Sequence, residues 1–264
     1  MSTTHRKILV ATPLFFLSAC SGKSNDANVA DDTSGNGDTA GDETTVFDPP
    51  EWCEEALADE LQSITTTEAS PYYVHHPATD SLDVHTVVFL PGGDGSQGSS
   101  DVIWNSFLSG GDSLDQVRVV MPYADDDSLL DEYDRSIEIL DEVLQCYGGD
   151  PDHVHLGGTS NGGVGAYGLM LDNPGTFATL LGAPGVFESY PNFYDEAVHA
   201  ALDGKAVYNG VGENDDGWNA AVEVVHEYLV EEGIDSVFVE FEGEGHVLTE
   251  EFDETVFFDF WLAH

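Results

Sequence analysis

Basic residues are scarce in this sequence. Its 264 residues include six Lys and Arg against 51 Asp and Glu, which gives a formal net charge of -45. Two of the six, Arg6 and Lys7, lie at the very start of the chain. Binding to the phosphates of nucleic acid or anionic lipid depends on Lys and Arg. The composition therefore excludes nucleic acid and anionic membrane surfaces as partners.

The excess of carboxylates favours a high-salt environment. Like charges at this density repel one another in dilute buffer, and molar salt screens that repulsion by shortening the Debye length to about 3 Å. We therefore expect a halophilic protein. An acidic surface protein from an ordinary environment is the alternative.

The sequence also lacks an apolar run near its start that is long enough to cross a bilayer, which takes roughly 20 residues. After His5-Arg6-Lys7, the apolar stretch that begins at Ile8 ends in Leu17-Ser18-Ala19-Cys20. This order is typical of a secretion signal with a lipoprotein cleavage box. We expect residues 1–20 to be a lipoprotein signal peptide, with lipid on Cys20 anchoring an exported protein at the cell envelope. A plain signal peptide or an unprocessed start are the alternatives.

Large apolar residues are nearly missing from residues 21–50. Asp, Gly, Thr and Ser dominate this segment, so it cannot bury enough surface to fold. The ordered spacing of a calcium-binding loop is also missing. We expect a disordered acidic linker over 21–50, followed by one folded domain over 51–264.

Cysteine is rare as well, with three residues in the chain. With Cys20 assigned to lipid, Cys53 and Cys146 remain inside the folded domain, and export makes a disulfide between them plausible. Closing a loop of 146 − 53 = 93 residues would stabilise the fold by about 4 to 5 kcal/mol on the chain-entropy model. Two separate buried thiols are the alternative.

Strand-like and helix-like segments alternate through the domain, which predicts an α/β fold with a doubly wound, mostly parallel sheet. We expect strands over 86–90, 117–121, 153–157, 177–181, 205–211 and 236–241, and helices over 131–147, 163–171, 218–231 and 256–262. The segment between the fourth and fifth of these strands leaves room for a short excursion but not for a large lid. Its aromatic residues, with Tyr123 and Trp218, could stack on a phenolic or sugar ring, or could pack in the core: Phe187, Tyr190, Phe193 and Tyr194.

The most informative motif is Gly158-Thr159-Ser160-Asn161-Gly162, which lies between an expected strand and an expected helix. A serine on so sharp a turn is held in strained backbone and projects from the top of the sheet, and the flanking glycines let neighbouring chain approach. An ordinary turn is the alternative. The order of strand, turn and helix favours Ser160 as a nucleophile.

A serine nucleophile needs a base and an acid that orients the base. His246 is best placed as the base, because it follows the last expected strand. Asp215 stands near the end of the preceding strand and is the favoured acid, with Asp216 as the alternative. These positions all fall at the carboxyl ends of strands, where open parallel sheets bind ligands.

The reaction also needs donors for the oxyanion of a tetrahedral intermediate. The amide of Asn161, the residue after the nucleophile, is one candidate. The glycine-rich turn after the first strong strand supplies the other, at Gly93 or Asp94.

Neither a metal nor a cofactor is expected. His75, His76 and His85 precede the first strong strand, but their spacing fits no common zinc pattern.

The runs LPGGDGS, HLGGTSNGGVGAYG, VGENDD and GEGHVLTEEFDETVFFDFW resemble secreted esterases of the α/β-hydrolase superfamily. The similarity is to the polyhydroxybutyrate depolymerase and the feruloyl or acetylxylan esterase group, and it covers roughly residues 84 to 264. It implies the α/β-hydrolase fold, Ser160 as nucleophile, Asp215 as acid and His246 as base, and an oxyanion hole from Gly93 or Asp94 with Asn161. Relatives often have His-Gly where this chain has Pro91-Gly92.

We therefore expect a membrane-tethered serine hydrolase that cleaves carboxylic esters, some of them polymer-borne, through an acyl-enzyme. A serine peptidase of the same fold and a non-catalytic binding lipoprotein are the alternatives.

Overall fold

A computed structural model describes residues 47–53, 60–64, 71–79, 83–109, 112–124, 133–193, 195–249 and 251–264. The expected signal peptide, Cys20 and most of the expected linker lie outside the described residues, as does Tyr194. Residues Val46–His264 form one compact unit. In the described part of the chain, no helix is long and apolar enough to cross a membrane.

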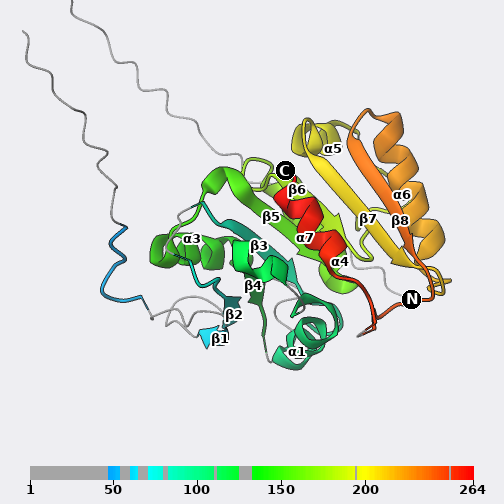
Figure 1. The fold of residues 1–264 in the computed structure, drawn as a ribbon. Coiled ribbons are helices and arrows are strands. Elements are labelled where there is room, and N and C mark those ends of the chain that lie inside the picture. The colour runs from blue at the N-terminus through cyan, green and yellow to red at the C-terminus, as the bar shows by residue number, and fades with distance from the viewer. Residues whose placement is uncertain are drawn as a thin grey trace, which may run out of the picture. The chain divides into compact units, whose positions relative to one another are not determined.

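Eight strands form one sheet in the order β1-β2-β4-β3-β5-β6-β7-β8 (Figure 1). The strands are β1 (Leu61–Ile64), β2 (Tyr72–His75), β3 (His85–Leu90), β4 (Val117–Pro122), β5 (Val154–Gly158), β6 (Thr179–Gly182), β7 (Ala206–Gly212) and β8 (Asp235–Phe241). From β4 to β8 all neighbours are parallel, whereas β1 and β2 add an antiparallel edge. The expected mostly parallel α/β sheet is confirmed.

Helical segments connect the strands: α1 (Gln97–Ile103), a π-helix (Trp104–Leu108), a 3-10 helix (Asp112–Gln116), α3 (Arg135–Tyr147), a second 3-10 helix (Pro151–His153), α4 (Asn161–Asp172), α5 (Asp195–Leu202), α6 (Asn219–Glu231) and α7 (Thr255–Leu262). Several of them differ from expectation, among them α5, which lies where only a short excursion was expected. The expected start of α4 at residue 163 was wrong, because the helix begins directly after Ser160. Helix α1 was not expected, because its polar sequence buries only Ser100 and Ile103 and carries no apolar stripe.

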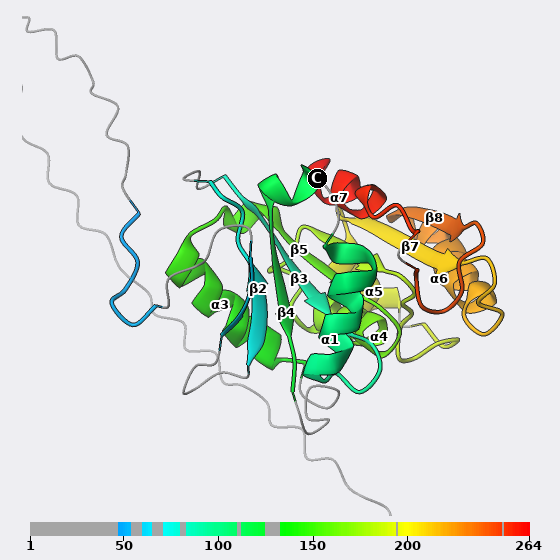
Figure 2. The ribbon, with the colours of Figure 1, turned by 60° about the horizontal axis from the view of Figure 1, so that its bottom comes forward.

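The core lies on both faces of the sheet, because strand side chains alternate in direction. Val88 and Leu90 of β3 pack with α4, α5 and α6. Val87 and Phe89 point to the other face and pack with α1 and α7. Figure 1 shows α7 crossing in front of the sheet, and Figure 2 shows α1 at the carboxyl ends of β3 and β4. Helices on both faces are what a buried parallel sheet requires.

Two links tie the end of α3 to the rest of the domain. Cys53 and Cys146 form a disulfide with an S–S distance of 2.07 Å, which fastens the start of the domain to α3. Arg118 of β4 is buried and donates to the carbonyl oxygens of Tyr147 (2.9 Å) and Gly148 (2.7 Å). Burial lowers the pKa of Arg118 to about 10, so it stays charged at neutral pH. A cation therefore satisfies carbonyls at the C-terminus of α3.

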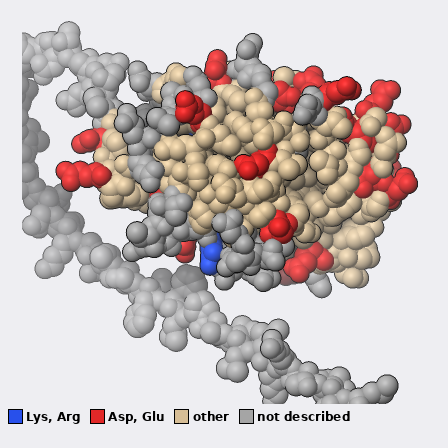
Figure 3. All heavy atoms as spheres, turned by 90° about the horizontal axis from the view of Figure 1, so that it is seen from below, with Lys and Arg blue, Asp and Glu red and all other residues tan. Residues whose placement is uncertain are grey.

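Carboxylates dominate the charged surface. Figure 3, which views the domain from below, shows red acidic groups around and within a broad tan area, and very little blue. Of the six basic residues of the sequence, Arg118 is buried inside the fold and so contributes no surface charge. Few cations are left to pair with the surface carboxylates.

Candidate functional site

Ser160 occupies a strained turn between β5 and α4. Its backbone angles are φ 56° and ψ −122°, and among the described residues no other non-glycine residue has a positive φ. Its amide donates to the carbonyl oxygen of Pro184 over 2.8 Å, and its own carbonyl accepts from Val164 over 2.9 Å to begin α4. Strain of this kind persists only where the surroundings over-determine it, and it is common at functional sites.

The glycines around Ser160 are required by close approach of the backbone. A Cβ on Gly158 would lie 2.3 Å from the carbonyl oxygen of Gly162, and a Cβ on Gly162 would lie 2.2 Å from that of Leu90. A Cβ on Gly92 would come within 2.9 Å of the Thr159 carbonyl oxygen. Glycine at these positions lets the loop after β3, strand β5 and α4 meet at Ser160.

The structure brings Ser160, His246 and Asp215 into one hydrogen-bonded chain. His246 Nε2 lies 3.0 Å from Ser160 Oγ, and His246 Nδ1 lies 2.7 Å from Asp215 Oδ2. A carboxylate only accepts, so Nδ1 carries the proton and Nε2 is left to accept the serine proton. The Asp215 side chain is 7% exposed, whereas Asp216 is exposed to solvent. Of the two candidate acids, Asp215 is the one that contacts the histidine.

The loops that carry the acid and the base pack directly against each other. A Cβ on Gly212 would lie 2.2 Å from the carbonyl oxygen of Gly245, so only glycine allows this approach. The amide of Asn214 donates to the Glu244 carbonyl oxygen over 2.8 Å. This backbone contact sets the distance between Asp215 and His246.

Two further carboxylates brace these loops. Glu213 accepts from the amide of Gly243 over 2.9 Å. Glu244 is buried and accepts from both the amide (2.8 Å) and the hydroxyl (2.9 Å) of Thr249. The only signal in the sequence was their place beside the acid and the base.

Backbone amides converge beside Ser160. Asn161 is the first residue of α4, so its amide has no acceptor within its own helix. Gly93 has φ 63° and lies in a turn closed by a 3.2 Å bond from the Gly95 amide to the Gly92 carbonyl. Asp94 follows in the same turn, and its carboxylate accepts from the amide of Ser96 over 3.0 Å. Gly93 and Asp94 both stay candidates for the second donor.

A cavity of about 490 Å³ opens onto Ser160 and His246. Three segments line it: the loop after β3 with α1, the turn that carries Ser160, and the residues from His246 to Leu248. The lining residues are Gly92, Gly93, Asp94, Ser96, Gly98, Ser99, Val102, Ile103, Thr159, Ser160, His246, Val247 and Leu248. A small organic molecule that reached Ser160 in this cavity would therefore also contact Gly93 and Asp94, the two candidates for the second amide donor.

Comparison with solved structures finds the same architecture elsewhere. The fluorophosphonate-binding serine hydrolase F of Staphylococcus aureus superimposes with a TM-score of 0.56 at 15% identity, over 76% of this chain and 96% of that one. The chain has the α/β-hydrolase fold. The thermophilic carboxylesterase EstE1 from a metagenomic library matches with a TM-score of 0.55 at 14% identity, over 80% of this chain and 89% of that one.

A thermostable esterase matches the α/β-hydrolase domain with a TM-score of 0.51 at 18% identity. The match covers 69% of this chain but 54% of the esterase, so this chain spans about half the length of that protein. No family model and no curated protein matches the sequence. The resemblance inferred from the motifs is thus confirmed at the level of the α/β-hydrolase fold.

The aromatic residues that could stack on a substrate ring or pack in the core do not line the cavity at Ser160, as far as the structure describes them. Tyr123 is buried and its hydroxyl lies 2.7 Å from that of Ser63. Phe187 is buried, and Phe193 stacks on Tyr228 of α6 at 4.3 Å between ring centroids. Core packing, the alternative, describes these rings better. Trp218 is different, because it stacks on His246 with ring centroids 5.6 Å apart.

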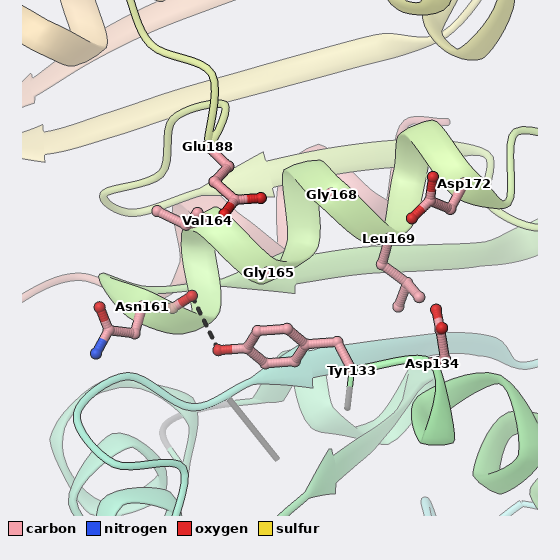
Figure 4. Close-up of a pocket in the computed structure, with 9 residues that line it drawn as sticks. All are labelled: Tyr133, Asp134, Asn161, Val164, Gly165, Gly168, Leu169, Asp172 and Glu188. Atoms are coloured by element: carbon pink, nitrogen blue, oxygen red, sulfur yellow. Dashed lines mark hydrogen bonds between the residues drawn. The ribbon is translucent and has the colours of Figure 1, made fainter. Parts of the chain in front are cut away.

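A second cavity, of about 570 Å³, runs along α4 of the α/β-hydrolase domain. Tyr133 lies flat against this helix, where a Cβ on Gly165 would come within 2.3 Å of its ring, and its hydroxyl donates to the Asn161 carbonyl over 3.0 Å (Figure 4). Burial raises the pKa of Tyr133 to about 12, so the hydroxyl remains a donor. The carboxylates of Asp134, Asp172 and Glu188 make this cavity polar, in contrast to the one at Ser160.

The histidines His75, His76 and His85 do not converge on a metal site. His76 Nδ1 accepts from Arg118 Nε over 3.1 Å, whereas His85 Nδ1 lies 2.9 Å from His155 Nε2. Among the described residues, metal-ligating atoms do come within 4.8 Å of one another at Asp83, Asp150 and His153. This group lies before β3 and β5, at the opposite end of those strands from Ser160.

Proposed function

We propose that the protein is a carboxylic ester hydrolase that works through an acyl-enzyme. The observation that carries the proposal is the hydrogen-bonded chain from Ser160 Oγ through His246 to Asp215. Ser160 itself lies on a strained turn with a positive φ. A serine hydroxyl is a weak nucleophile at neutral pH, and an adjacent base oriented by a carboxylate is what activates it.

The reaction follows from this geometry. Ser160 Oγ attacks the ester carbonyl carbon while its proton passes to His246 Nε2, and Asp215 stabilises the imidazolium through Nδ1. The oxyanion is held by the amides of Asn161 and of Gly93 or Asp94. When the C–O bond to the alcohol breaks, His246 gives its proton to the departing oxygen. Water then attacks the acyl-enzyme by the same route and frees Ser160.

The esterases among the structural neighbours favour ester hydrolysis over peptide hydrolysis. The motifs shared with the polyhydroxybutyrate depolymerase and feruloyl or acetylxylan esterase group support esters carried on polymers as substrates. A panel of feruloyl, acetyl-sugar and 3-hydroxybutyrate esters, assayed beside a casein digest in molar salt, separates these substrates. Cleavage of casein alone would replace the ester hydrolase with a peptidase.

We further propose that the enzyme is exported and anchored through lipid on Cys20, on the strength of the cleavage box in the sequence. Radiolabelled palmitate should enter the wild-type protein in cells and not the Cys20→Ala variant. Equal labelling of both would refute the anchor.

We also propose adaptation to high salt, supported by the net charge of -45. The free energy of unfolding should rise between dilute buffer and molar NaCl, and an equal osmolality of sorbitol should not reproduce the whole rise. A protein equally stable without salt would contradict this.

Covalent labelling tests the reaction itself. A fluorophosphonate probe should label the wild-type protein and leave Ser160→Ala unlabelled. Asp215→Asn should lower kcat by about 10⁴-fold, because the histidine loses its orienting acceptor. Asp216→Asn is the matched control, since its carboxylate is exposed one residue away, and it should retain nearly full activity. An unlabelled wild type in both high and low salt would mean a binding protein instead.

A further inference from the structure

The cavity at Ser160 has an aliphatic rim that is exposed to solvent. Val102 of α1 is 52% exposed and Val247, directly after His246, is 59% exposed. Eight large apolar residues are exposed among those the structure describes, and two of them lie at this one cavity. Exposed apolar side chains gathered at a concave site are a sign of a ligand.

The rim continues inward into a buried aliphatic wall. Ile103 is 5% exposed and Leu248 is 3% exposed, and both line the same cavity. Phe, Tyr and Trp are missing from the described residues that line it. This surface can desolvate an alkyl group but offers no aromatic face for stacking.

One fixed negative charge stands in the same cavity. Asp94 Oδ1 accepts from the amide of Ser96 over 3.0 Å and from the hydroxyl of Ser99 over 2.8 Å. Hydrogen bonds from Ser96 and then Ser99 lower the pKa of Asp94 to about 2, so the carboxylate stays ionised. The described lining residues include no Lys or Arg to offset it.

We propose that this cavity selects esters with an uncharged aliphatic group, which packs between Val102 and Val247, and that Asp94 disfavours esters with a carboxylate near the scissile bond. The inference rests on the proposed ester hydrolysis and names the substrate class for it. Either side of the ester could supply the alkyl group, so the test examines both.

Two series of esters measure the aliphatic preference. One extends the acyl chain of p-nitrophenyl esters from acetate to hexanoate, and the other extends the alcohol of acetate esters from methyl to pentyl. In one series kcat/KM should rise by about fourfold for each methylene that enters the cavity. The series that rises identifies which side of the ester the cavity holds, and a flat profile in both would overturn the proposal.

Isosteric variants test whether the preference for longer alkyl chains depends on Val102 and Val247. Val102→Thr and Val247→Thr keep the side-chain shape but add a hydroxyl, so each should flatten the rise. Val230→Thr is the matched control, because Val230 is also 52% exposed but lies near the end of α6, outside the cavity lining. It should keep the wild-type profile. An unchanged slope in both rim variants would also overturn the proposal.

A pair of substrates measures the effect of charge. p-Nitrophenyl butyrate and p-nitrophenyl hemisuccinate have acyl chains of equal length, but the second carries a carboxylate. The wild type should prefer butyrate, and Asp94→Asn should narrow this preference by about fivefold in dilute salt and by less in molar salt. Asp235→Asn, at the far end of β8, should leave the ratio unchanged. Because both substrates are measured on the same variant, a general loss of activity from a distorted loop cancels in the ratio of their rates.

The two proposals are distinguishable by their outcomes. If the fluorophosphonate probe labels Ser160 but neither chain length nor charge affects the rate, only the substrate class is wrong. If no ester is cleaved and no label is taken up, the proposed hydrolysis is wrong.

Discussion

The side-chain amide of Asn161 donates a hydrogen bond to the carbonyl oxygen of Gly93, with 2.7 Å between Nδ2 and the oxygen. The bond joins the residue after Ser160 to the loop of Gly93 and Asp94, which carries the second proposed oxyanion donor. In the proposed oxyanion hole, Asn161 would supply one amide from its backbone, and its side chain would hold the loop that supplies the other. Positioning of this kind matters, because oxyanion donors act through fixed geometry.

Removing this bond should lower kcat more than it changes KM. We expect Asn161→Ala to lose up to about 10²-fold in kcat, near the cost of losing one oxyanion donor. Tyr133→Phe is the control, since it removes only the hydrogen bond to the Asn161 carbonyl and should cost far less. Steady-state kinetics on one ester compares the variants. Equal kcat in Asn161→Ala and wild type would show that the loop of Gly93 keeps its position without this hydrogen bond.

Adding one methyl group should have opposite effects on stability at two glycines of α4. Gly162→Ala places a Cβ 2.2 Å from the Leu90 carbonyl oxygen. We expect this variant to lose about 1–3 kcal/mol of unfolding free energy and also to lose activity. Gly168→Ala meets no atom within 4 Å and should stabilise α4 by about 0.5–1 kcal/mol. Urea unfolding in molar salt measures both. Equal stability of the two variants would contradict the close packing around Ser160.

The disulfide between Cys53 and Cys146 closes a loop of 93 residues. Replacing both cysteines with serine should lower the free energy of unfolding by about 4 to 5 kcal/mol, mainly because the unfolded chain gains freedom. Activity under folding conditions should persist, since Cys146 lies on α3 and does not line the cavity at Ser160. Urea unfolding of the oxidised, reduced and double-serine proteins checks this. Reduction without effect on stability would count against the bond.

Buried histidine should make the fold sensitive to acid. Burial lowers the pKa of His155 to about 3, below the 6.5 of a free histidine. The unfolded chain therefore binds the extra proton first, and stability from this group is present above pH 6.5 and declines as the pH falls toward about 3, by up to about 1.4 kcal/mol per pH unit. His155→Gln should flatten this decline relative to His226→Gln, which removes a half-buried histidine of α6. Parallel slopes of unfolding free energy against pH would contradict the assignment.

Much of the sheet was predictable because its central strands are short apolar runs closed by glycine or proline. The expected strands at 86–90, 117–121, 205–211 and 236–241 each match an observed strand to within one residue at either end. Strands β1 and β2 were missed. Tyr72–His75 is buried throughout and shows no alternation, and it pairs antiparallel with residues far along the chain. Local periodicity carries no information about such a partner.

The candidate site likewise has a part that local sequence patterns predicted and a part that they did not. The sequence by itself determined which residues to consider, because the order of strand, Gly-x-Ser-x-Gly and helix and the residues after later strands are local patterns. Tertiary structure alone decided that Asp215 rather than Asp216 meets His246, that Asn161 holds Gly93, and that aliphatic rather than aromatic side chains line the cavity. These are contacts between segments far apart in the sequence, such as the 68 residues between Gly93 and Asn161 and the 31 between Asp215 and His246, and only the packed sheet brings such segments together.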